Sequence, residues 1–124
     1  MRAGDPHRIV VEAYPAVLVR KFVDKASYKN DEKRKQTESH RVIRHTLLQR
    51  IVERPLTDYG VRVVADRSLA DDPSGDHLDA LLCAIQAAWA WTQRKNGFGA
   101  PQDMDPLEGW IADPACNVRG AEGT

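Results

Sequence analysis

The segment from Leu78 to Trp91 constrains the fold most strongly, because Asp79 and Gln86 are its only polar side chains. A helix that is apolar on all sides is normally buried on more than one of them. Asn96-Gly97, which follows Arg94 and Lys95, is typical of the end of a helix. The sequence therefore predicts a long buried helix near residues 76–95 as the central element of the core.

The chain has 124 residues, enough for one domain with a single core. We expect one domain over residues 1–114 and a flexible tail over 115–124. The formal net charge is zero, but residues 20–54 hold eleven Lys/Arg against five Asp/Glu, and residues 58–79 hold six Asp against two Arg. Two cysteines are too few for a disulfide framework. The N-terminus lacks a signal-peptide pattern and no apolar run is long enough for a membrane span, so a cytoplasmic location is expected.

The rest of the chain indicates an α/β fold. Residues 9–14 form a β-branched run that ends at Pro15, a pattern typical of a strand covered on both faces. Short helices are predicted from Ala16 to Val23 and from about Thr37 to Pro55. Residues 61–64 resemble a short strand, and residues 108–112 either a last strand or an aromatic anchor around Trp110. We therefore expect a few-stranded mixed or parallel sheet packed by about three helices.

Asp76 and Asp79 are three residues apart, so they share one face at the N-terminal end of the predicted core helix. The simpler interpretation is that they cap the helix and interact with its dipole. The functional interpretation is that they supply oxygen ligands to Mg²⁺ or Mn²⁺. Glu12, a lone acid in an apolar strand, is the candidate third carboxylate, because a buried acid without a partner is costly.

The basic segment offers candidate phosphate contacts at Lys29, Lys33, Arg41 and Arg44. Solvated helix and loop faces would account for the same charges. No zinc spacing, glycine-rich phosphate loop or nucleophile elbow is present in the sequence.

Four short motifs occur in order: Val-Glu-Ala-Tyr-Pro at 11–15, Tyr28-Lys29, Asp-His-Leu-Asp-Ala-Leu at 76–81, and Glu-Gly-Trp-Ile at 108–111. Together they resemble the C-terminal half of an uncharacterised family of predicted nucleases with an RNase H-like fold, the domain of unknown function four-two-nine. The resemblance implies a metal-dependent nuclease that acts on nucleic acid, with Glu12, Asp76 and Asp79 as catalytic metal ligands. It also matches Lys29 to a recurring lysine.

The resemblance has one gap, because the family's fold opens with a strand that carries an aspartate, and nothing before Ile9 matches that strand. We therefore expect an N-terminally truncated nuclease piece, a partial RNase H-like fold with weak or no activity. The alternative is a non-catalytic α/β module for interaction or oligomerisation. In either case the uncovered edge of the 9–14 strand favours self-pairing into a homo-oligomer.

Overall fold

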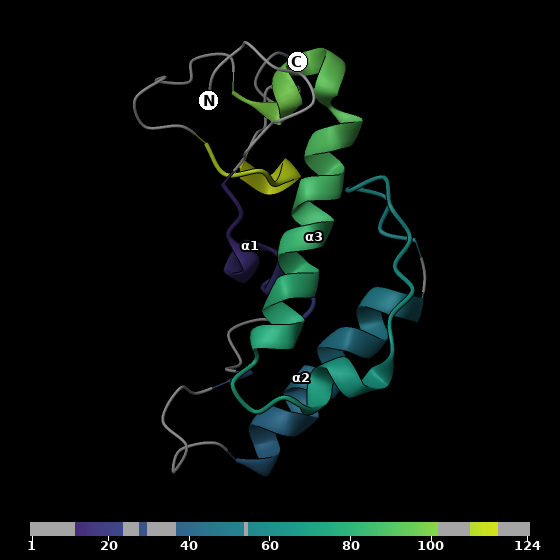
Figure 1. Cartoon of the computed structure of the whole chain (residues 1–124), viewed down its shortest axis with the longest axis vertical. Helices are drawn as coiled ribbons and strands as arrows, with labels where there is room; N and C mark the ends of the chain where they lie inside the picture. The colour runs from purple at the N-terminus through teal and green to yellow at the C-terminus, as the bar shows by residue number, and fades with distance from the viewer. Residues whose placement is uncertain (1–11, 24–27, 30–36, 54, 102–109, 117–124) are drawn as a thin grey trace.

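The computed structural model describes residues 12–23, 28–29, 37–53, 55–101 and 110–116. Of these residues, 61% are helical and 5% are in strand pairing. The expected α/β fold with a mixed sheet, and with it the partial RNase H-like arrangement, is therefore wrong for this part of the chain. In its place the structure has a small helical assembly (Figure 1).

The longest helix, α3 (Asp76–Thr92), runs along the molecule as the central element in Figure 1. Its buried residues all lie on one side; they are Leu78, Leu82, Ile85, Gln86, Trp89 and Ala90. The predicted core helix is thus present, but it ends at Thr92 rather than near 95. A 3-10 segment, η3 (Arg94–Gly99), follows it, with Gly97 at a φ of 65°.

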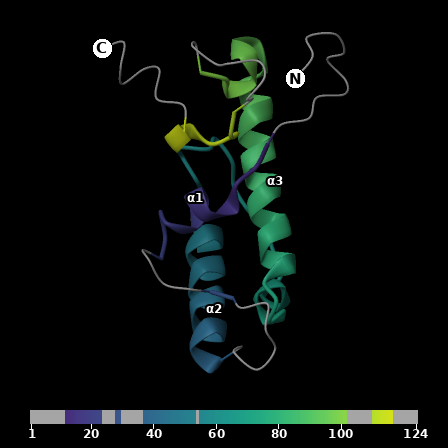
Figure 2. The same ribbon diagram turned by 90° about the vertical axis from the view of Figure 1, so that its left-hand side faces the viewer.

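The second helix, α2 (Glu38–Glu53), begins just after Thr37 and ends before Pro55, as its apolar spacing predicts. Leu47, Leu48 and Ile51 are buried on one face of it. The short helix α1 (Pro15–Val19) begins at Pro15, whose missing N–H is harmless in a first turn. Figure 2 shows α1 and α2 on the same side of α3.

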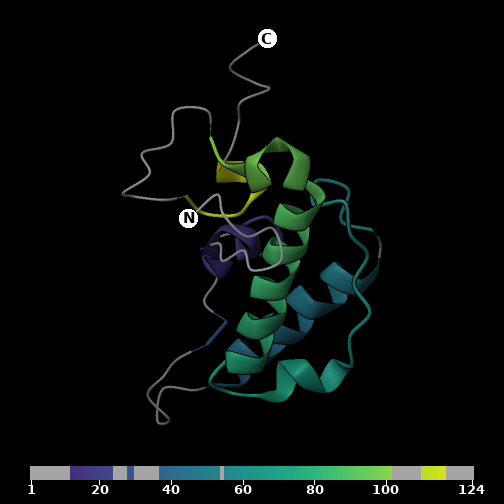
Figure 3. The ribbon, with the colours of Figure 1, turned by 45° about the horizontal axis from the view of Figure 1, so that its top comes forward.

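A short 3-10 helix, η2 (Arg67–Asp71), follows an extended segment and packs against both α2 and α3. In Figure 3 it lies at the end of the molecule where α3 begins. Its N-cap is Asp66, whose side chain accepts a hydrogen bond from the Ser68 N–H over 2.8 Å. This segment brings the chain to the start of α3.

The expected strands are reduced to two isolated bridges among the described residues. Glu12 pairs in parallel with Ile111, and Leu56 pairs with Val61 in antiparallel. Just beyond the first bridge, Gln86 on α3 bonds both backbone groups of Tyr14, at 2.8 Å to its N–H and 2.9 Å to its carbonyl. A side-chain amide therefore satisfies the backbone where a neighbouring strand was expected, and Pro15 then starts a helix. The predicted strand residues 9–11 lie outside the described residues.

The end of the described chain returns to the core. Ala112 and Asp113 are fully buried, and η4 (Pro114–Cys116) follows them. Ala115 and Cys116, which the sequence assigned to a tail, therefore belong to a short helix. In the described part of the chain, none of the helices combines the length and apolar character that crossing a membrane requires.

Candidate functional site

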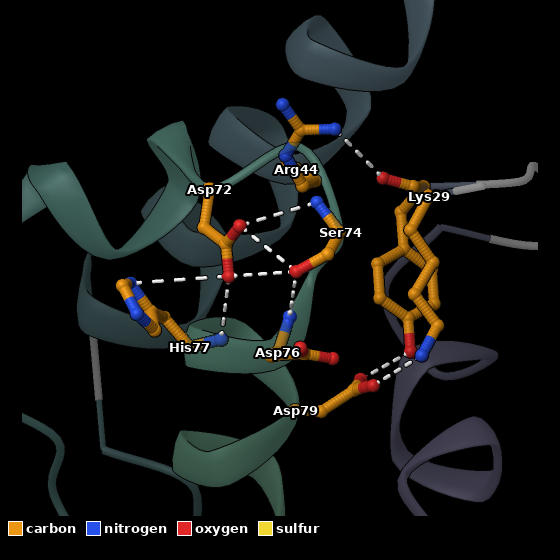
Figure 4. A network of polar contacts seen from close by, with 8 residues as sticks. Lys29, Arg44, Asp72, Ser74, Asp76, His77 and Asp79 are labelled. Carbon is orange, nitrogen blue, oxygen red and sulfur yellow. Dashed lines mark hydrogen bonds and ion pairs between the residues drawn. The ribbon is translucent and has the colours of Figure 1, made fainter. Parts of the chain in front are cut away.

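The start of α3 is organised by a loop aspartate and a serine that precede the helix. Gly75 is the N-cap residue, with a φ of 76°, and has no side chain to offer. Asp72 accepts a hydrogen bond from the His77 N–H over 3.2 Å, and the Ser74 hydroxyl accepts one from the Asp76 N–H over 3.3 Å (Figure 4). These contacts satisfy N–H groups of the first turn, which have no partner inside the helix.

The Asp72 carboxylate is held in place by Ser74, whose hydroxyl lies 2.9 Å from both of its oxygens. These hydrogen bonds lower the pKa of Asp72 below its usual range, with further help from the backbone N–H groups of His77 and Ser74. The expectation that Asp76 or Asp79 caps the helix is therefore wrong, since Asp72 and Ser74 supply the capping atoms. The sequence signal was present as Asp72-Pro73-Ser74, a local pattern of short polar side chains that bond nearby backbone.

Asp79 has a different environment, because its two oxygens face residues from a distant segment. The Tyr28 hydroxyl donates to one oxygen over 2.5 Å, and the Lys29 ammonium forms a salt bridge with the other. Both members of the ion pair remain partly exposed, at 32% for the Lys29 side chain and 22% for Asp79. Burial raises the pKa of Tyr28, and the hydrogen bond to Asp79 raises it further, so the phenol stays a donor.

Arg44 fixes the segment that carries Tyr28. Its guanidinium is almost fully buried and donates to the Ala70 carbonyl over 2.8 Å and to the Tyr28 carbonyl over 3.1 Å. Figure 4 shows this arginine beside the loop that leads into α3. Because its N–H groups are bonded to carbonyls within the protein, Arg44 has a structural role and holds residue 28 near α3.

The other candidate phosphate contacts are spread out. Arg41 is exposed on α2, 3.3 Å from Glu38 and 3.8 Å from Asp71. Lys33 lies outside the described residues. Of the basic side chains that were singled out from the sequence and are described by the structure, only Lys29 contacts an acid of α3.

The three expected metal ligands are not assembled in the described chain. Asp76 is exposed in the first turn of α3, near Asp79 in Figure 4. Glu12 is exposed in the bridge to Ile111, two residues before Tyr14. Tyr14 contacts Gln86, which is about two helical turns or ~10 Å along α3 from Asp79. Within the described ranges, no group of three or more His, Cys, Asp or Glu side chains is arranged to hold a metal ion. The three-carboxylate set therefore does not fit a bound metal in this arrangement.

The family model described as "Protein of unknown function (DUF429)" matches residues 2–103 of the chain. The chain belongs to this family. No curated protein matches the chain, and no solved structure matches it. The segment matched to DUF429 contains Lys29, Asp76 and Asp79.

A second polar cluster lies beside the middle of α3, at Gln86, and includes a residue beyond the segment matched to DUF429. The fully buried Asp113 accepts hydrogen bonds from the Tyr59 hydroxyl over 2.5 Å and from the Gln86 amide over 2.9 Å. Lys21 lies 3.4 Å from it and 4.4 Å from the centre of the Tyr59 ring. Burial and the bond to Asp113 raise the pKa of Tyr59. Sequence reasoning missed this cluster, because its members come from four separate segments.

Proposed function

We propose that this DUF429 member is a nuclease-type domain whose acidic pair, Asp76 and Asp79, binds Mg²⁺ or Mn²⁺ weakly next to nucleic-acid phosphates. The observation that carries the proposal is the ion pair between Lys29 and Asp79. It puts a cation against a partly exposed carboxylate at the start of a long helix, with a second exposed carboxylate one turn away. Membership of the family and the matched motifs add support.

Two carboxylates support the proposal, because a largely hydrated magnesium ion binds proteins through one or two carboxylates and keeps its remaining positions for water and phosphate. Such an ion would supply charge neutralisation for a phosphate and a more acidic water molecule. Glu12 does not join the pair, so we expect weak or no hydrolysis. Lys29 holds Asp79 in place and competes with any other cation for it.

The proposal is tested by thermal melts in the absence and presence of Mg²⁺ or Mn²⁺. We expect a small metal-dependent rise in Tm for the unchanged chain, because a ligand that binds only the folded state stabilises it. Lys29→Met should enlarge the rise, because it removes the competing ammonium, and Asp79→Asn should abolish it. Arg41→Met, which removes an exposed cation on α2, is the matched control and should leave the metal response unchanged. Equal melting with and without metal in all four proteins would contradict the proposal.

A direct assay follows hydrolysis of single-stranded DNA, double-stranded DNA and RNA by the purified chain with Mn²⁺. We expect little cleavage. Strong metal-dependent cleavage that disappears in Asp79→Asn would support the acidic pair and refute the expectation of weak activity.

A second candidate function, a non-catalytic interaction module, is favoured by one specific observation. Both oxygens of Asp79 already have partners, and Arg44 anchors the segment that supplies them. A purely structural role for Asp79 explains these contacts without any ligand. In that case Asp79→Asn lowers Tm, metal has no effect on any variant, and no nucleic acid is cleaved.

A further inference from the structure

The outward face of α3 carries an apolar row that ends in a large aromatic residue. Ala80, Ala84, Ala87 and Trp91 are all exposed, and Trp91 is 55% exposed. The helices α1 and α2 lie on one side of α3 (Figure 2), and the buried residues of α3 face the core. A half-exposed tryptophan on the central helix of the core is an unusual residue to leave in water, since burial of an aromatic side chain contributes strongly at interfaces.

The spacing of this row is the same when it is read in either direction. Its members are separated by four, three and four residues, so Ala80 and Trp91 have the same midpoint as Ala84 and Ala87. If a second copy of α3 lies antiparallel on the first, Trp91 of each copy meets the small Ala80 of the other. Ala84 and Ala87 meet in the middle, where small side chains allow helix axes to approach to about 8 Å.

The charges near the ends of the row come close to the same symmetry, since Asp76 and Arg94 have their midpoint at residue 85, half a residue from the midpoint of the row. Asp76 is exposed at the start of α3, and Arg94 is exposed just past its end. The Arg94 guanidinium lies 4.7 Å from the centre of its own Trp91 ring. The antiparallel arrangement therefore puts Arg94 and Trp91 of one copy beside Asp76 and Ala80 of the other. Because a twofold axis relates the two copies, this contact occurs twice in the dimer.

We propose that the chain associates with a second copy of itself through an antiparallel contact between the exposed faces of α3. The occupant of this face is a second copy because the row is complementary to itself in residue size, and the residues that flank it, Asp76 and Arg94, carry opposite charges. The contact uses the helix face and not the strand edge that the sequence suggested. It does not depend on the proposed function, and it is measured in metal-free buffer so that metal binding by Asp76 does not enter the result.

Sedimentation equilibrium of the full chain over a range of concentrations tests the proposal. We expect a monomer–dimer equilibrium for the unchanged chain and a monomer for Ala84→Glu, which introduces two buried like charges into the centre of the contact. Val64→Glu is the matched control, because Val64 is an exposed apolar residue outside α3 with 93% of its surface accessible. A chain that stays monomeric at every concentration, or a dimer that survives Ala84→Glu, would overturn the proposal.

A charge exchange tests the antiparallel register. Asp76→Arg or Arg94→Asp alone should each weaken dimerisation roughly 3- to 30-fold, because each removes two exposed ion pairs per dimer and creates repulsion. The double variant Asp76→Arg/Arg94→Asp restores the opposite charges and should recover the dimer. Circular dichroism checks that each variant is folded. If the double variant dimerised as weakly as the single variants, this antiparallel register would be excluded.

Discussion

Asp72, Asp76 and Asp79 are close together in the sequence, yet their carboxylates have different surroundings. Asp72 contacts backbone N–H groups at the start of α3, Asp79 contacts a lysine and a tyrosine, and Asp76 is exposed to solvent. The three residues are chemically equivalent in the sequence. What separates their roles is which donors reach their oxygens, and those donors come from the fold.

Asp72→Ala should lower the free energy of unfolding by about 0.5–2 kcal/mol, because it removes the side chain that caps α3. The pKa of Asp72 is lower in the folded chain than the value of about 3.9 typical of an unfolded aspartate. Its stabilisation is therefore complete above the unfolded pKa and is lost as pH falls through the folded pKa. Urea denaturation across this acidic range measures both effects.

Asp72→Asn is the control for the pH effect, because it keeps an acceptor oxygen and cannot titrate. The difference in stability between the unchanged chain and Asp72→Asn should shrink as the solution is acidified. A difference that stays constant with pH would show that Asp72 does not act through its charge.

The start of α3 depends on a glycine for two separate reasons. Gly75 has a φ of 76°, a left-handed conformation that other residues adopt only with strain. A Cβ atom at Gly75 would also lie 2.7 Å from Lys29 Cδ and 2.9 Å from Lys29 Cβ. The absence of a side chain at Gly75 therefore leaves the space through which Lys29 reaches Asp79.

We predict that Gly75→Ala destabilises the chain by more than the roughly 1–2 kcal/mol of left-handed strain alone. Gly60→Ala separates the two contributions, because Gly60 has a similar φ of 66° and its Cβ would meet, among the described residues, Thr92 Cγ2 at an ordinary contact distance of 3.8 Å. Thermal melts of both variants should rank Gly75→Ala as the less stable. Equal losses would mean that Lys29 moves aside without cost.

The elements that could be predicted from the sequence are those defined by local patterns. The apolar run from Leu78 to Trp91 predicted α3, and the three- and four-residue spacing of apolar residues before Pro55 predicted α2. The predicted sheet was wrong because a β-branched run indicates a preference for extended backbone but does not show which segment will pair with it. The backbone of Tyr14 pairs with the Gln86 side chain and not with a neighbouring strand. In the same way the contact between Lys29 and Asp79 joins positions far apart in sequence, which no local pattern predicts.

At the scale of the whole molecule, Asp113 is a polar contact point between segments that are far apart in the sequence. It accepts hydrogen bonds from Tyr59 and Gln86 inside the core, and Lys21 lies beside it. Gln86 in turn bonds the backbone of Tyr14. One buried carboxylate therefore connects α3, the segment before α1, the turn at residue 59 and the chain end that follows Trp110.

Asp113→Ala should cost about 3–5 kcal/mol, because it leaves a lysine and two polar groups without their buried partner. Tyr59→Phe should cost about 1–3 kcal/mol, since the carboxylate keeps its other contacts. Asp58→Ala removes an exposed acid next to Tyr59 and should change stability little. Chemical denaturation of the three variants gives the ranking, and a loss for Asp113→Ala no larger than for Asp58→Ala would contradict it.

Asp113 lies ten residues past the end of the DUF429 match, which stops at residue 103. A protein trimmed to the end of the family match would therefore lack Asp113, which is part of the buried interior, although it would contain the whole matched segment. Tyr59 and Gln86 would then face a water-accessible slot, and the trimmed protein should be cleaved faster by proteases than the full chain. Boundaries for recombinant production should accordingly be placed after Cys116.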